Sequence, residues 1–87
     1  MENPSLIEYP TDFPLKVMGR SEPRLVQTIV DIVQKHAPDF DPSTVEMRAS
    51  KKNSYLSVTC TIRATSRQQL DALYGELCDH PSVVMVL

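Results

Sequence analysis

Histidine and cysteine are the side chains best suited to bind a metal or to act as nucleophiles, and this chain holds two of each. Cys60 and Cys78 lack the Cys-x-x-Cys spacing of zinc and redox sites. His36 and His80 each lie at the end of an expected helix, and the helical rise places them about 20 Å apart. We therefore expect no metal, no cofactor and no catalytic residues.

Basic residues near an expected helix start suggest a site for an anion. Ser21-Glu22-Pro23 is typical of a helix N-terminus, where free N–H groups attract negative charge. The turn at Lys51-Lys52 is expected at the same end of the fold. The sequence therefore predicts a site for a small carboxylate or phosphate at Gly19, Arg20, Ser21, Lys51 and Lys52. The alternative is an ordinary solvated turn.

An acylphosphatase-type enzyme is a further interpretation of the same residues. Such an enzyme binds its substrate with an arginine and backbone amides in a glycine-rich loop. Gly19-Arg20 has part of that arrangement, but the whole chain holds only two glycines. A tight turn before a helix explains the pair better.

A nucleic-acid binder is the runner-up to a protein-binding module, and it would use Arg20, Arg48, Lys51 and Lys52. RNA-recognition domains of the expected topology stack bases on two or three aromatic side chains. Here the open sheet face offers Tyr55 alone. The net charge of −2, from 9 basic and 11 acidic residues, shows no basic surplus. We therefore expect nucleic acid to be an unlikely partner.

The stretch from Ser54 to Thr65 alternates strictly, which is typical of a strand with one buried face. Its apolar positions are Leu56, Val58, Cys60, Ile62 and Ala64. Its polar positions are Tyr55, Ser57, Thr59, Thr61 and Arg63. A strand of this length is expected in the interior of a sheet.

The elements follow in the order strand, helix, strand, strand, helix, strand. We expect strands at 12–20, 45–49, 54–65 and 82–87, and helices at 21–37 and 66–79. Ser66 and Gln69 form a capping box for the second helix. The order predicts an α+β, ferredoxin-like βαββαβ sandwich, with a four-stranded antiparallel sheet (order 4-1-3-2) and both helices on one face. Residues 1–10 are expected to form an N-terminal arm, and residues 11–87 a single ferredoxin-like domain.

The C-terminal strand is expected at a sheet edge, and it carries no charge or proline to protect that edge. Either Val84 and Val86 pack under the helices, or the opposite set does. The sequence leaves both assignments open. We take Val83, Met85 and Leu87 as the candidate interface, for a protein partner or for self-association. The competing explanation is that Leu6, Ile7 and Tyr9 of the arm cover the same surface.

Length and composition bound the class of protein. With 87 residues and 41% apolar content, the chain has room for one modest core. No apolar run approaches the roughly 18 residues of a membrane span. The first residues lack the pattern of a secretory signal. Two cysteines without a disulfide pattern favour a reducing, cytoplasmic compartment.

Several short motifs together resemble the YbeD-like family of small bacterial proteins. They are Tyr9-Pro10, Phe13-Pro14 followed by Lys16-Val17-Met18-Gly19, Lys35-His36-Ala37-Pro38, Tyr55 with Ser57, and Val84-Met85-Val86-Leu87. The resemblance covers nearly the whole chain and implies a ferredoxin-like fold similar to ACT regulatory domains. It supplies no catalytic residues, and a link with lipoate metabolism has been suggested for the family. Together with the edge strand, it predicts a non-catalytic regulatory or adaptor module that binds a protein or a small ligand.

Overall fold

Two long strands form the centre of the sheet in the computed structural model, which describes residues 8–87. β1 (Thr11–Arg20) and β3 (Tyr55–Ala64) pair antiparallel along their whole length. β2 (Glu46–Ala49) pairs with β3, and β4 (Val83–Val86) pairs with β1, both antiparallel. The sheet order β2-β3-β1-β4 confirms the predicted order.

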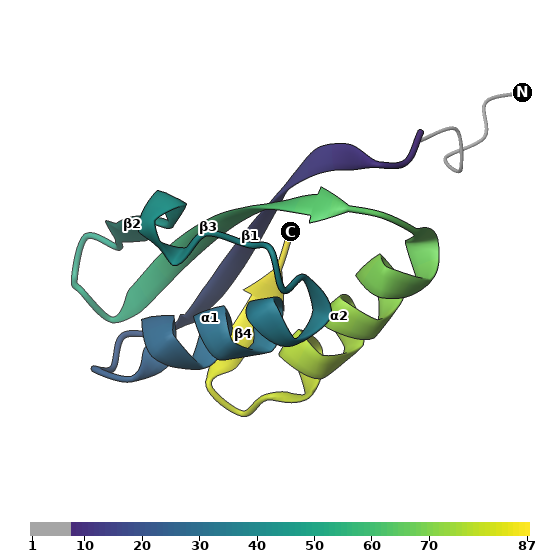
Figure 1. Ribbon diagram of the computed structural model, residues 1–87. Helices are drawn as coiled ribbons and strands as arrows, with labels where there is room; N and C mark the ends of the chain where they lie inside the picture. The colour runs from purple at the N-terminus through teal and green to yellow at the C-terminus, as the bar shows by residue number, and fades with distance from the viewer. Residues whose placement is uncertain (1–7) are drawn as a thin grey trace, which may run out of the picture.

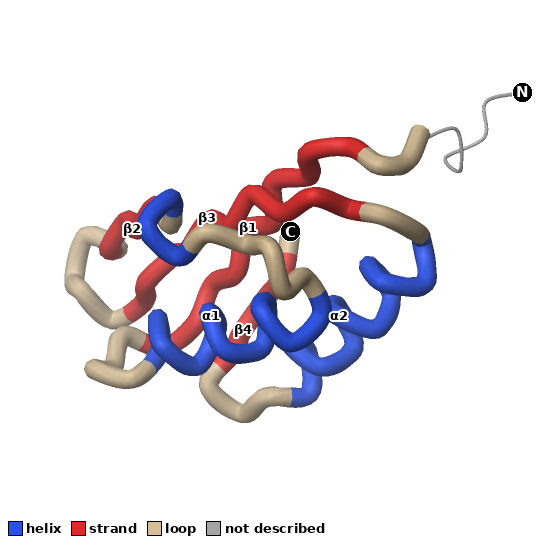
Figure 2. The backbone as a smooth tube through the Cα atoms, in the orientation of Figure 1, coloured by secondary structure: helices blue, strands red, loops and turns tan. Residues whose placement is uncertain are grey.

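Both helices, α1 (Leu25–His36) and α2 (Arg67–Asp79), lie on the same face of the sheet (Figure 1). Figure 2 shows the resulting two layers, with the helices side by side under the strands. A short 3₁₀ helix, η2 (Pro42–Thr44), leads into β2. Within residues 8–87, neither helix is long and apolar enough to cross a membrane. The layout confirms the ferredoxin-like prediction.

The predicted alternation of β3 is correct. Val58 and Cys60 are fully buried, and Ile62 is 1% exposed, because all three face the helices. Thr59 lies on the opposite face and is half-buried. The helices contribute the other side of the core. Their buried residues are Leu25, Ile29, Val30, Ile32 and Val33 in α1 and Leu70, Leu73 and Leu77 in α2.

The first helix begins later than the sequence predicts. Arg24 occupies the N-cap position and makes no side-chain capping hydrogen bond. Ser21, the predicted cap, donates its backbone N–H to the carbonyl of Ser54 (3.0 Å) instead. This bond ties Ser21 to the residue before β3, which is a tertiary contact that local capping rules do not include.

Gln69 ties the start of α2 to the end of α1. Its backbone N–H donates to Ser66 Oγ (3.1 Å), as the predicted capping box requires. Its Oε1 accepts from the backbone N–H of Thr65 (2.7 Å), one residue before the usual position. Its Nε2 donates to the carbonyl of His36 (2.8 Å). One side chain thus caps α2 and satisfies a terminal carbonyl of α1.

Proline in a central strand has a simple explanation here. Lys16 and Leu87 exchange two backbone hydrogen bonds, of 3.3 and 2.7 Å. Backbone groups of alternate residues point the same way, so Pro14 directs its nitrogen to the β4 side of β1. Within residues 8–87 no strand lies beside Pro14 on that side, because β4 pairs only with the later part of β1. The missing N–H therefore removes no sheet hydrogen bond.

The two faces of β3 predict very different effects of truncation. Ile62→Ala should lower the free energy of unfolding by about 2–4 kcal/mol, since it leaves a cavity under the helices. Thr59→Ala removes only a half-buried side chain on the other face, so its effect should stay below about 1 kcal/mol. Denaturant unfolding measures both. Equal losses would contradict the assigned faces.

The two glycines should respond to alanine with opposite signs. A Cβ at Gly19 would lie 2.6 Å from the carbonyl oxygen of Ser82 and 2.7 Å from Leu25 Cδ1. Gly19→Ala should therefore destabilise the protein by about 1–3 kcal/mol. At the helical position Gly75 nothing lies within 4 Å of the added Cβ. Gly75→Ala should stabilise by up to about 1 kcal/mol, because alanine favours the helix. Thermal melts of the two variants test the pair, and a stabilised Gly19→Ala would refute the close approach.

Candidate functional site

The sheet face opposite the helices carries the side chains that are free to meet a ligand or partner. The pairing registers arrange them in rows across the strands. One row consists of Met85, Met18, Ser57 and Arg48. The next row consists of Leu87, Lys16, Thr59 and Glu46. These two rows, with Tyr55, are termed the open face.

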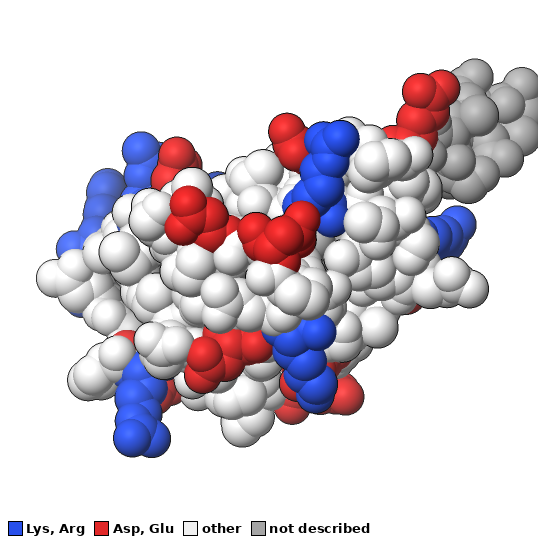
Figure 3. Space-filling model, in the orientation of Figure 1, with Lys and Arg blue, Asp and Glu red and all other residues white. Residues whose placement is uncertain are grey.

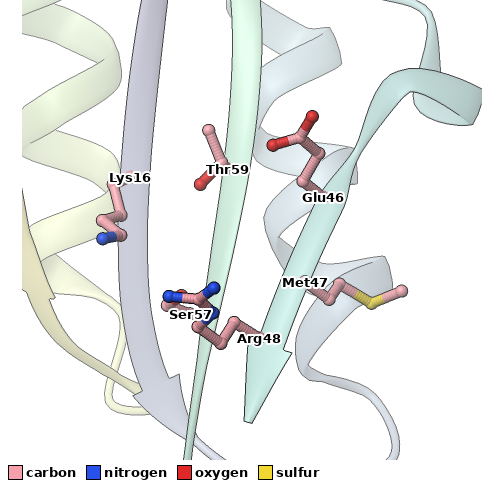
Figure 4. Close-up of a pocket in the computed structure, with 6 residues that line it drawn as sticks. All are labelled: Lys16, Glu46, Met47, Arg48, Ser57 and Thr59. Atoms are coloured by element: carbon pink, nitrogen blue, oxygen red, sulfur yellow. The ribbon is translucent and has the colours of Figure 1, made fainter.

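The middle of the open face is a shallow hollow between Lys16 on β1 and Arg48 on β2 (Figure 4). Ser57 and Thr59 of β3 lie between these two cations. Arg48 extends across β3 and lies over Ser57. A second hollow shares Lys16, Arg48 and Ser57 and continues to Tyr55. Two cations therefore border one depression that is lined by hydroxyl groups.

On this side of the sheet some charged side chains form ion pairs and others do not. Arg63 Nη1 lies 3.2 Å from Asp12 Oδ1, so that pair is neutral. Within residues 8–87, Lys16 and Arg48 form no ion pair. Glu46 is the carboxylate that lines the hollow. On the face that Figure 3 shows, basic and acidic side chains are interspersed. The hollow, by contrast, has one more positive than negative side chain.

Apolar side chains adjoin the hollow along β4. Met85 is 47% exposed and Leu87 is 59% exposed. They are neighbours on one side of the strand, and Met18 lies opposite Met85 on β1. Contiguous exposed apolar surface is typical of an interaction site, whereas single exposed apolar residues are ordinary. The role of Met85 and Leu87 in an interface stays a prediction.

The expected exposure of Val83 needs correction. The pairing of β4 with β1 shifts register after Met18, so that Gly19 lies opposite Val83. As a result Val83 and Val86 both pack against the core, and Val84 is 50% exposed. Neither assignment by strict alternation is right. An irregularity in an edge strand breaks the two-residue period on which both assignments rest.

The predicted anion-binding residues lie at one end of the sheet, and the backbone N–H groups of two of them, Arg20 and Ser21, are occupied. Ser21 donates its N–H to Ser54, beside the turn that carries Lys51-Lys52. Arg20 donates its N–H to the carbonyl of Ser82 (3.1 Å). The side chains of Arg20 and both lysines are exposed. The N–H groups of Arg20 and Ser21 are therefore not available to an anion, and the anion site stays a prediction.

The hydrogen bonds of His36 and His80 are structural. His36 Nε2 lies 2.8 Å from Glu76 Oε1. His80 Nδ1 accepts the backbone N–H of Ser82 (3.1 Å). Burial raises the pKa of the Cys60 thiol to about 11, so this thiol stays protonated and unreactive at neutral pH. Among residues 8–87, no group of three or more His, Cys, Asp or Glu side chains is placed to hold a metal ion.

The sequence analysis did not predict that Lys16 and Arg48 line one hollow. Both occupy polar positions of expected strands, so their common face could be read from alternation. Their positions on either side of β3 depend on two strand registers, which place Lys16 opposite Thr59 and Arg48 opposite Ser57. Side-chain period gives the face of a residue but not its partner on the next strand.

Glu76 links the two helices and makes the stability of the pair depend on pH. Hydrogen bonds from His36 and Lys35 hold the pKa of the Glu76 carboxyl below its usual value of 4.5. A depressed pKa in the folded state stabilises the fold above the unfolded-state pKa. That contribution is lost as the pH falls through the folded-state pKa.

Glu76→Gln should therefore destabilise the protein at neutral pH and lose this effect in acid. The difference in unfolding free energy between wild type and variant should shrink below about pH 4.5, the usual pKa of the group. Denaturant titrations from pH 3 to pH 7, at intervals of about one unit, measure it. Asp39→Asn, at an exposed carboxylate that forms no ion pair within residues 8–87, is the control. A difference that is independent of pH would contradict the assigned contact.

Two solved structures share this fold. Protein HP0495 from H. pylori superposes with a TM-score of 0.76 at 15% identity, covering 100% of this chain and 94% of that one. The ACT domain from GTP pyrophosphokinase of Chlorobium tepidum superposes with a TM-score of 0.59 at 18% identity, covering 88% and 97%. At such identities the likeness shows the fold, and it confirms the ACT-like architecture.

The sequence relatives are bacterial proteins of similar length. The UPF0250 protein of Nitrosomonas europaea is 56% identical over the whole of both chains. The UPF0250 protein of Bordetella pertussis is 57% identical over 95% of this chain and 91% of the relative. Neither name states a catalytic activity. A family model described as a protein of unknown function (DUF493) matches residues 4–87. The chain therefore belongs to the DUF493 family, the YbeD-like family that its motifs resemble.

Proposed function

We propose that this chain is a regulatory or adaptor module without catalysis, which binds a protein partner through the open face. The observation that carries the proposal is the apolar surface of Met85, Leu87 and Met18, which no helix covers within residues 8–87. The helices bury Val58, Cys60, Ile62 and Ala64 on the apolar side of β3, so the core is formed without this second apolar surface. A protein partner would remove it from water.

The ACT-like fold supports the proposal by analogy alone. The Chlorobium tepidum neighbour is one domain of a GTP pyrophosphokinase, so the fold there forms part of a larger enzyme. In the present proposal the chain instead binds a separate partner protein. The β4 edge belongs to the same surface, so a second copy of the chain is one of the partners to test. The unpaired thiols of Cys60 and Cys78 fit the reducing, cytoplasmic compartment that the proposal includes.

A photo-crosslinking amino acid placed at Met85 should capture a partner in the native cell, because this side chain lies on the open face. The same group at Gln68, an exposed position of α2, is the matched control. We expect discrete adducts from position 85 that are missing or much weaker from position 68. Gel electrophoresis with mass spectrometry of the adducts measures this, and an adduct of two copies of the 9.8 kDa chain would identify self-association.

Leu87→Asp separates partner binding from chance proximity. This exposed change should leave the unfolding transition almost unchanged and should weaken crosslinking from position 85. A chain that lacks residues 1–7 tests whether the arm shields the face, since its removal would then increase crosslinking. Equal adducts from positions 85 and 68, or none from 85, would contradict the proposed function.

A further inference from the structure

The open face has two halves of different chemistry. Along β4 and at Met18 of β1 it is apolar, with Met85 and Leu87 on β4. Lys16 of β1 belongs to the other half. Over β3 and β2 it is cationic and hydroxyl-lined. We propose that this face docks an amphipathic helix of a partner protein, with its apolar stripe on the first half and an acidic flank against Lys16 and Arg48. The proposal rests on the proposed function and names the partner's chemistry.

The acidic flank follows from the two cations of the hollow. Lys16 and Arg48 line it from the strands on either side of β3, and neither forms an ion pair within residues 8–87. A guanidinium and an ammonium are suited to carboxylates, the first in a two-pronged geometry. Ser57 and Thr59 between them add hydroxyl donors. Carboxylates of a partner would form the ion pairs that Lys16 and Arg48 lack within residues 8–87.

The dimensions of the sheet favour a helix. Strands in a sheet lie about 4.8 Å apart, so the outer strands of four are about 14 Å apart. An α-helix with its side chains is about 10–12 Å across, which matches this width. The opposite face of the same sheet carries two helices side by side, so helices pack against this sheet. A helix on the open face would add a third layer, an arrangement that protein domains adopt occasionally.

Glu46 gives the site a direction. It lies at the outer edge of the hollow, on β2, opposite Thr59. An acidic residue of the partner placed beside Glu46 would be repelled, whereas one placed over Ser57 would meet Arg48. The arrangement therefore rejects a uniformly acidic surface and selects a helix whose acids form one flank.

Single-stranded nucleic acid fits the surface less well. Sheets that bind RNA stack bases on two or three aromatic side chains. Within residues 8–87, Tyr55 is the aromatic side chain of the open face. The apolar half would also remain unused by a phosphate backbone. Binding of a single-stranded nucleic acid is therefore compared with binding of the helical peptides.

Synthetic helical peptides test the proposal with the full-length chain. Two 15-residue peptides share one leucine stripe and carry either glutamate or lysine along the flank, and a third keeps the glutamates but has alanine in place of leucine. Amide shift titrations should show the acidic leucine peptide moving Lys16, Met18, Arg48 and Ser57. The lysine and alanine peptides should bind about tenfold more weakly or worse, since each lacks half of the contacts.

A charge reversal provides the decisive comparison. The double variant Lys16→Glu and Arg48→Glu should reverse the preference, so that the lysine peptide binds more tightly than the acidic one. The matched control is Lys51→Glu with Lys52→Glu, which makes the same change of charge at an exposed turn and should keep the wild-type preference. Amide spectra of both variants report whether each is folded.

The outcomes separate this inference from the proposed function. Equal binding of the acidic and lysine peptides would overturn the acidic partner, while crosslinking from Met85 would still support an apolar one. No shift on the open face with any peptide would overturn the docked helix. Shifts there from a ten-nucleotide single strand, without response to the acidic peptide, would assign the surface to nucleic acid. Sedimentation as a dimer with the open face covered would assign it to a second copy.

Discussion

The antiparallel pairing of β1 with β3 is the constraint on which the rest of the structure depends. It joins Thr11–Arg20 to Tyr55–Ala64 without a break, and every other element attaches to one of these two strands. The pairing puts the apolar positions of both strands on one side. Once this ribbon forms, the helices have one surface on which to bury their leucines, isoleucines and valines.

The open face is a consequence of the same arrangement. The chain has two helices, and each buries one apolar stripe against the same side of the sheet. Nothing in residues 8–87 covers the other side, which therefore carries polar residues on β3 and apolar ones near β4. A face of mixed character on a small domain suits a contact that forms and dissociates, because the domain stays folded without it.

Close contacts at the sheet ends hold the layers in place. At one end Gly19 lets β1 approach the Ser82 carbonyl and the Leu25 side chain, where a Cβ would not fit. At the other end Gln69 and Glu76 of α2 bind the C-terminal turn of α1. The helices are thus fixed by hydrogen bonds at their ends and by apolar packing between them.

The sequence by itself determined the order of elements, the faces of β3 and the capping of α2 at Ser66. These features depend on side-chain period and on local backbone preference, which neighbours in the chain are enough to set. Only the tertiary structure decided the later start of α1, the register shift that packs Val83 against the core, and the hollow that Lys16 and Arg48 both line. Each of these depends on which residue lies opposite on another strand, and strand pairing is a contact between distant parts of the chain that no local pattern encodes.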